Sequence, residues 1–264
     1  DEIGLGNDSR YRAYVLAIEN ILRQYKSTSE WADFIPYLAK IKRVRHWKKT
    51  VNILFEKRFF SLFFPFENNK TIENNSQYSY IPKRITLFKH LAQCLHPALP
   101  AGVHLNTLEV YETIFRIVDK QQLQRDIILY AYGLFSLLPV ANISIKSNLL
   151  QIYDNYFLPF GDGLNPVLTG FLIGLFSSLE EGAEYFDRII NLLDKLANRI
   201  DEFYFYTCLW SAIHLVPSVR YQGSLFILNH FDRQKNLTEQ FHLIGLSIDT
   251  MVKRTKKKLI IKFS

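Results

Sequence analysis

The chain has 264 residues, a net charge of +7 at pH 7, 48% hydrophobic residues and 15% aromatic residues. This apolar content excludes a wholly disordered chain, and 11 glycines and 9 prolines are too few for the frequent turns of an all-β protein. No apolar run reaches the length of about 18 residues that suggests a membrane-spanning helix. Cys94 and Cys208 both lie in apolar helical patterns, so we expect buried, reduced thiols, as in a cytosolic protein.

The positive charge is concentrated in two segments. Residues 40–58 contain eight basic residues and one acidic residue, and residues 253–262 contain six basic residues and no acidic one. The rest of the chain has a small net negative charge. A mildly acidic body with two basic segments favours contact with an anionic surface and differs from a uniformly basic nucleic-acid binder.

Two helices are predicted near the start of the chain. Apolar residues at helical spacing indicate a first helix that ends near Lys26. Residues 27–30, STSE, match a capping box, which opens a second helix from Trp31 to about Val44. The helical pattern then breaks, because residues 59–66 are a dense apolar run and residues 68–79 are an asparagine-rich loop.

Residues 83–118 predict a helix, a proline-bounded corner and a second helix. Pro97 and Pro100 cannot continue the first helix, and we expect Gly102 to turn the chain with a positive φ. One apolar face of the first helix consists of Ile85, Phe88, Leu91, Ala92 and Leu95. Such a unit is the building block of an α-solenoid.

About seven more helical patterns follow. They lie near residues 123–138, 145–156, 167–179, 185–200, 203–215, 219–231 and 241–252. Residues 178–181, SLEE, match a second capping box that opens the helix over 185–200. Helices joined by short proline or glycine corners, without strand alternation, predict an all-α fold, an α-solenoid of HEAT/armadillo-like helical repeats with about ten helices. An antiparallel bundle is the competing architecture.

The sequence offers no set of catalytic residues. It contains no phosphate-binding loop, HExxH zinc motif or GxSxG nucleophile motif. His90, Cys94, His96 and His104 match no standard zinc spacing, so we expect them to pack and cap the helix corner. We therefore expect no enzymatic activity, no cofactor and no metal, and the acidic remainder of the chain argues against nucleic acid as a partner.

The basic segment 40–58 is a candidate lipid-binding site. Its cations alternate with aromatic residues such as Trp47 and Phe55, a composition that suits an anionic membrane surface. A solvated helix face with snorkelling lysines explains the same pattern equally well. The candidate residues in this segment are Lys42, Arg43, Arg45, Lys48 and Lys49.

Residues 83–115, KRITLFKHLAQCLHPALPAGVHLNTLEVYETIF, resemble the signature of the N-terminal domain of the Dopey family. Similar blocks occur in order at 11–19 (YRAYVLAIE), 29–40 (SEWADFIPYLAK), 129–138 (LYAYGLFSLL), 156–179 (YFLPFGDGLNPVLTGFLIGLFSSL), 180–188 (EEGAEYFDR) and 205–220 (FYTCLWSAIHLVPSVR). The resemblance covers about residues 10–44 and 78–252. It implies one helical-repeat domain over residues 1–264.

Two segments depart from the family pattern. Residues 45–77 look like an insertion, so that a loop or insertion is expected over 45–79, and residues 253–264 form an atypical basic tail. Most of the basic segment 40–58 therefore lies outside the pattern. Lys83, Arg84 and Lys89 lie inside it and become competing lipid-binding candidates.

The resemblance implies a non-enzymatic adaptor or scaffold in membrane traffic. Such a protein is cytoplasmic and peripheral on Golgi, trans-Golgi and endosomal membranes. The implied partners are a large Sec7-related helical-repeat protein, an aminophospholipid flippase, conventional kinesin and an anionic membrane surface that contains phosphatidylinositol 4-phosphate. The alternative is a pure protein-docking module for the Sec7-related partner, without direct lipid binding.

Overall fold

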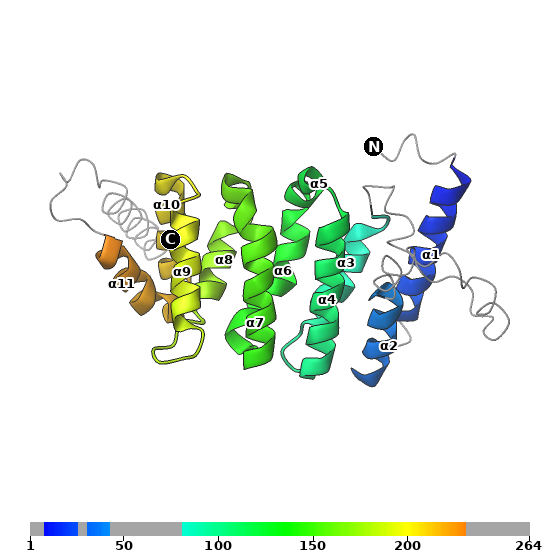
Figure 1. The fold of residues 1–264 in the computed structure, drawn as a ribbon, viewed down its shortest axis with the longest axis horizontal. Helices are drawn as coiled ribbons and strands as arrows, with labels where there is room; N and C mark the ends of the chain where they lie inside the picture. Colours follow the sequence, from blue (N-terminus) through cyan, green and yellow to red (C-terminus); the bar gives the residue numbers. More distant parts are fainter. Residues whose placement is uncertain (1–7, 26–30, 43–80, 231–264) are drawn as a thin grey trace, which may run out of the picture. The chain divides into compact units, whose positions relative to one another are not determined.

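The computed structural model of the chain describes residues 8–25, 31–42 and 81–230 (Figure 1). The described residues form eleven α-helices and no strand, so the prediction of an all-α fold with about ten helices is confirmed. The helices are α1 (Ser9–Tyr25), α2 (Trp31–Lys42), α3 (Arg84–Cys94), α4 (Ala101–Ile117), α5 (Lys120–Arg125), α6 (Ile127–Leu137), α7 (Ile143–Ile152), α8 (Leu168–Phe176), α9 (Phe186–Ala197), α10 (Glu202–Leu215) and α11 (Arg220–His230). Within these ranges no helix combines the length and the apolar character needed to cross a bilayer.

The helices belong to two compact units. Unit 1 consists of Asp1–Leu134 and Asn142–Leu149, and unit 2 of Phe135–Ala141 and Leu150–Ser264. The predicted first capping box at 27–30, the expected insertion at 45–79, the last predicted helix and the basic tail at 253–264 lie outside the described residues.

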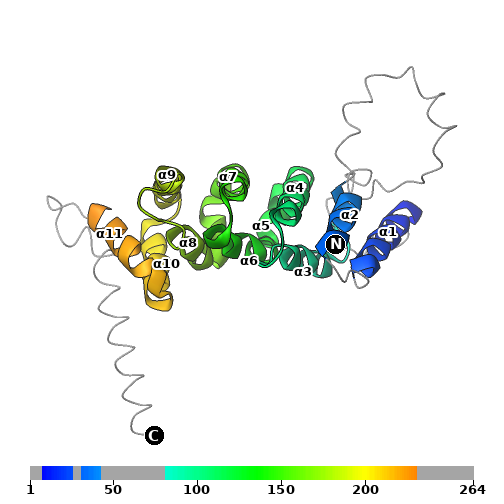
Figure 2. The ribbon, with the colours of Figure 1, turned by 90° about the horizontal axis from the view of Figure 1, so that it is seen from below.

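Unit 1 has two layers of helices. Figure 2 shows α2 and α4 next to each other in one layer and α3 and α6 in the other, and α2 packs against α4. Buried residues of both layers, among them Leu38, Leu91 and Val103, form the core of the unit. Burying such side chains stabilises the fold by about 1.5–3 kcal/mol each.

The predicted helix, corner and second helix are α3, residues 95–100 and α4. α3 ends at Cys94, and Pro100, in an extended conformation with φ −62° and ψ 151°, precedes the first residue of α4. The expectation for Gly102 was wrong, because Gly102 is the second residue of α4 and has no positive φ. The extended prolyl residue sets the direction in which α4 starts.

The helix predicted over 123–138 is interrupted. α5 ends at Arg125 and α6 begins at Ile127, so the prediction of one continuous helix was wrong. Asp126 stands between the two helices with its side chain buried, where it accepts a hydrogen bond from the amide of Gln122. The break places this carboxylate against α3, where it has a second partner, Arg84.

Unit 2 is built around aromatic side chains. The rings of Phe135 and Phe171 stack with centroids 4.4 Å apart, and Tyr153 and Phe157 meet them at steeper angles. α8 packs against α10 within this unit. Between α7 and α8 the chain forms a π-helix over Tyr153–Phe157 and a 3₁₀ segment over Leu158–Val167, where the sequence predicted only a stop and a new start.

The second predicted capping box was wrong. The Ser178 hydroxyl donates to the carbonyl of Gly174, which belongs to the end of α8, and α9 does not begin until Phe186. The hydroxyl therefore bonds backward to the preceding helix, a local alternative that serine side chains often use.

Both cysteines are free and buried, as the sequence predicted. Burial raises the pKa of the Cys94 thiol to about 12 and also raises the pKa of the Cys208 thiol. Both thiols are therefore protonated at neutral pH, and a reactive role for either is disfavoured because the thiolate is the nucleophile.

Candidate binding groove

Lys83, the first lipid-binding candidate within the family pattern, lies at the entrance to α3. Its backbone is left-handed, with φ 52°, a conformation that costs a non-glycine residue about 1 kcal/mol. The Lys83 ammonium lies 3.2 Å from a carboxylate oxygen of Glu19 on α1, and half of the lysine side chain is exposed. This ion pair compensates much of the positive charge of Lys83.

Arg84, the second candidate, forms an ion pair with a buried carboxylate of unit 1. Its Nε lies 3.3 Å from Oδ2 of Asp126, and its side chain is 26% exposed. Because Asp126 is buried, removing the arginine would leave a carboxylate without its cation in a poorly solvated position, which is costly. Arg84 therefore has a structural role in joining α3 to the junction of α5 and α6.

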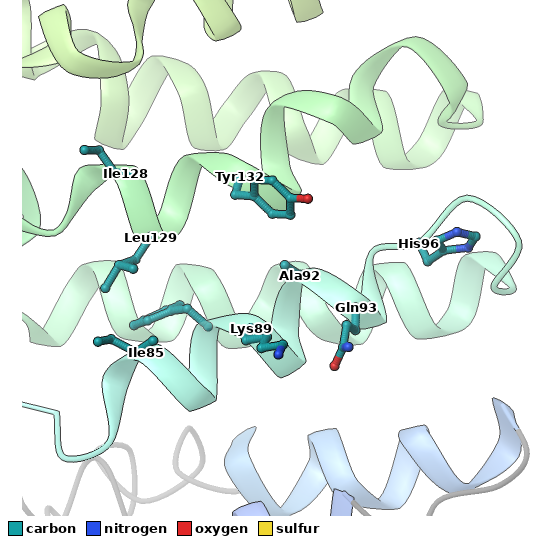
Figure 3. Close-up of a pocket in the computed structure, with 9 residues that line it drawn as sticks. Ile85, Lys89, Ala92, Gln93, His96, Ile128, Leu129 and Tyr132 are labelled. Atoms are coloured by element: carbon teal, nitrogen blue, oxygen red, sulfur yellow. The ribbon is translucent and has the colours of Figure 1, made fainter.

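Lys89, the third candidate, is exposed and lies on a groove between α3 and α6 (Figure 3). The groove belongs to unit 1 and has a volume of about 530 Å³. Its lining residues are Ile85, Phe88, Lys89, Ala92, Gln93, His96, Ile128, Leu129 and Tyr132. Among these three candidates only Lys89 lines this groove.

The walls of the groove are apolar and open to solvent. Ile85 of α3 is 67% exposed, and Ile128 and Tyr132 of α6 are 60% and 82% exposed. Phe88, at 2% exposure, is the buried lining residue that joins the groove to the core. On the apolar face that the sequence predicts for α3, Phe88 and Leu91 are buried and Ile85 is exposed.

Two contacts hold α3 and α6 in place. A methyl group on Gly133 of α6 would lie 2.9 Å from the Cα of Ala92, so the two backbones approach as closely as a glycine allows. Arg84 and Asp126, which precede Ile85 and Ile127 in sequence, join the starts of the two helices. These contacts set the separation of the groove walls before any partner arrives, and such preorganisation lowers the cost of binding.

The remaining predicted site residues belong to the basic segment 40–58. Lys42 ends α2, but its side chain lies outside the described part of the structure, as do Arg43, Arg45, Lys48 and Lys49. The lipid-binding role of all eight candidates stays a prediction.

The histidines pack and cap the helix corner, as expected from the sequence. His104 donates a 2.9 Å hydrogen bond to the carbonyl of His96, and the His90 ring stacks on Tyr25 with centroids 3.9 Å apart. In the described ranges, no three or more His, Cys, Asp or Glu side chains gather where they could hold a metal ion.

Sequence reasoning missed Ile128 and Tyr132. They are spaced i and i+4 on α6 and lie beside buried Ile127 and Ala131, so the helix is apolar on both faces. An apolar helix in a soluble protein is normally buried all round. The sequence therefore offers no signal for these two residues, and only their exposure in the structure marks them as part of a binding surface.

The helices and the open apolar groove assign the chain to the helical-repeat class of all-α domains. Domains of this class bind partners on extended surfaces. The model of the family described as Dopey, N-terminal, matches residues 8–262. The chain therefore belongs to the Dopey family.

Curated relatives support this membership. The chain is 40% identical to Protein DOP1B of Mus musculus over 253 residues, which is 96% of the chain and 10% of the relative. It is 38% identical to Protein pad-1 of Caenorhabditis elegans over 249 residues, 94% of the chain and 9% of the relative. It is 26% identical to Protein DOP1 of Saccharomyces cerevisiae over 216 residues, 79% of the chain and 11% of the relative. The chain thus spans about a tenth of the length of these relatives, and no solved structure matches it.

Proposed function

We propose that this chain is part of a non-enzymatic adaptor or scaffold in membrane traffic that acts at Golgi, trans-Golgi and endosomal membranes. Family membership supports this proposal through what the resemblance implies. The structural observation in its favour is the α3–α6 groove, in which large apolar side chains face solvent beside an exposed lysine. A soluble domain that exposes such side chains together gains by covering them with a partner.

The first proposed ligand is an anionic membrane that contains phosphatidylinositol 4-phosphate. Each lysine or arginine near such a surface contributes about 1 kcal/mol to binding. Of the three candidates on α3 and its entrance, Lys83 and Arg84 already form ion pairs with carboxylates. The positive charge of Lys89 is therefore the least compensated of the three. The other proposed contacts are Lys42, Arg43, Arg45, Lys48 and Lys49 in the basic segment.

The proposed protein partners are those that the family resemblance implies. They are a large Sec7-related helical-repeat protein, an aminophospholipid flippase and conventional kinesin. A scaffold that holds such partners at a cytoplasmic membrane face needs accessible surface, and it needs no catalytic residue of its own.

Flotation with liposomes tests the lipid part of this proposal. Vesicles with phosphatidylinositol 4-phosphate are compared with vesicles of equal charge that contain only phosphatidylserine, at low and physiological salt. We expect preferential, salt-sensitive flotation with the phosphoinositide, reduced in Lys89→Gln and reduced further when the five cations between residues 42 and 49 are replaced by glutamine. Arg12→Gln, at an exposed position of α1, is the control for loss of one charge. Equal flotation with both vesicles would contradict phosphoinositide contact.

The alternative function is a protein-docking module for the Sec7-related partner that binds no lipid. The ion pairs of Lys83 and Arg84 favour it, because they occupy two of the cations otherwise available to a headgroup. Pull-down with that partner separates the two functions. Retained capture by a variant that no longer floats with vesicles would support docking alone, whereas parallel loss of both would support a shared surface.

A further inference from the structure

We infer that the α3–α6 groove binds an acidic amphipathic helix of a partner protein. The inference rests on the scaffold function proposed above and specifies the chemistry of one partner at one site. It starts from three observations: apolar walls open to solvent, a cation on the lining, and two helices held at a fixed separation.

The backbone chemistry of the groove favours a helical occupant. The main-chain groups of α3 and α6 already bond within their own helices, and the walls are formed by Ile85, Ile128 and Tyr132. An extended peptide laid on such walls would find no backbone partners on the groove and could satisfy its N–H and C=O groups only with water, whereas a helix satisfies them internally.

The length of the groove also suits a helix. Ile85, Lys89 and Gln93 follow one another along α3, as Figure 3 shows, and span a rise of about 12 Å, which is slightly more than two helical turns. A docked helix places apolar anchors at i, i+3 or i+4, and i+7 over that distance. Three anchors match the apolar walls and floor of a groove of about 530 Å³.

The charges specify an acidic helix. Among the described residues, the polar members of the lining are Lys89, Gln93 and His96, and none of these lining residues is a carboxylate. The nearest acidic residue in sequence to the α6 wall, Asp126, is buried and paired with Arg84. A glutamate or aspartate beside the apolar anchors would therefore meet Lys89, and no described residue of the lining is an acid that would compete for this lysine.

A membrane and a second copy of the chain fit this groove less well. A membrane surface is held by several cations at about 1 kcal/mol each, and in the part of the chain that the structure describes Lys89 is the single lysine or arginine that lines the groove. Two copies joined face to face through this groove about a twofold axis would bring one Lys89 towards the other, which is unfavourable for like charges.

The experiment uses two fluorescein-labelled probe peptides and the full 264-residue chain. Both peptides are alanine-based helices with leucines at i, i+4 and i+7; one has glutamates beside the leucines and the other has lysines at the same positions. Fluorescence anisotropy measures the dissociation constants. We expect the glutamate peptide to bind about fivefold more tightly, the size of one exposed charge contact, and Lys89→Glu to reverse this preference.

Two wall variants and a matched control locate the binding. Ile128→Ser and Tyr132→Ser should each weaken the glutamate peptide about tenfold, as loss of an apolar anchor does. Ile143→Ser on α7 should leave binding unchanged, because Ile143 is 61% exposed, like Ile128 at 60%, but does not line the groove. Circular dichroism and urea titration should show native folding for all three, since the replaced side chains are exposed.

Three results would overturn the inference. They are equal affinity for the two peptides, equal loss of binding in Ile143→Ser and Ile128→Ser, and a failure of both peptides to bind while Ile128→Ser abolishes the binding of anionic vesicles or of a second copy of the chain. Failure here remains distinct from failure of the proposed function. Liposome flotation and partner pull-down do not depend on the probe peptides, and a scaffold that uses another face would still pass them.

Discussion

Helices α6 and α8 consist almost entirely of apolar residues, yet the fold treats them differently. Five of the six large apolar side chains of α8 are buried and Ile173 is half-buried, whereas α6 leaves Ile128 and Tyr132 more than half exposed. The two helices differ in how much of their surface is covered by neighbouring elements. α8 is enclosed by neighbours within unit 2, whereas one face of α6 opens onto the groove. Apolar composition alone therefore does not distinguish a core helix from a binding helix.

The largest effect that this comparison predicts is on core truncation. Leu172→Ala should lower the free energy of unfolding by about 3 kcal/mol, because it removes a fully buried side chain and leaves a cavity. Ile128→Ala on α6 should change it by less than about 0.5 kcal/mol. Urea denaturation followed by circular dichroism measures both. Similar losses for the two variants would mean that α6 is as enclosed as α8.

The next effect comes from two glycines of the same helix. A methyl group on Gly174 would lie 2.5 Å from the carbonyl oxygen of Phe135, so Gly174→Ala should destabilise the chain by about 2 kcal/mol. Gly170→Ala should instead stabilise it by about 0.5–1 kcal/mol, since nothing lies within 4 Å of the added methyl and alanine is the better helix former. The opposite signs, read from the midpoint of thermal unfolding, test the close packing of α8; a stabilising Gly174→Ala would refute it.

A smaller effect is expected at the ion pairs that place α3. Asp126→Ala should cost about 1.5 kcal/mol, because it leaves Arg84 and the Gln122 amide without their shared acceptor. Glu19→Ala, which breaks the exposed pair with Lys83, should cost less than about 0.5 kcal/mol. Equal costs in urea denaturation would show that Asp126 is no more important to the fold than a surface acid.

Local patterns in the sequence predicted the elements whose signals are local. The helix near the start of the chain and the helix–corner–helix unit around Pro97 and Pro100 are present as α1, α3 and α4. The break at Asp126 was missed because the group that helps to hold that carboxylate is Arg84, on a helix far away in the sequence. The pattern at 178–181 was misread because the Ser178 hydroxyl had a closer acceptor in the preceding turn.

The candidate site shows the same limit. Lys83, Arg84 and Lys89 were equivalent in the sequence, and their differences come from partners on other helices: Glu19 for the first, Asp126 for the second and the α6 wall for the third. The sequence supplied the cations, but only the packing of α3 against α6 shows which of them adjoins exposed apolar surface.

Hydrogen–deuterium exchange of the chain with and without the glutamate peptide tests the groove most directly. We predict slower exchange confined to α3 and α6, residues 84–94 and 127–137, with weaker protection in Ile128→Ser at the same peptide concentration and full protection in Ile143→Ser. Protection centred instead on α10 and α11, whose exposed Leu215, Tyr221 and Leu228 offer other apolar contacts, would contradict the account.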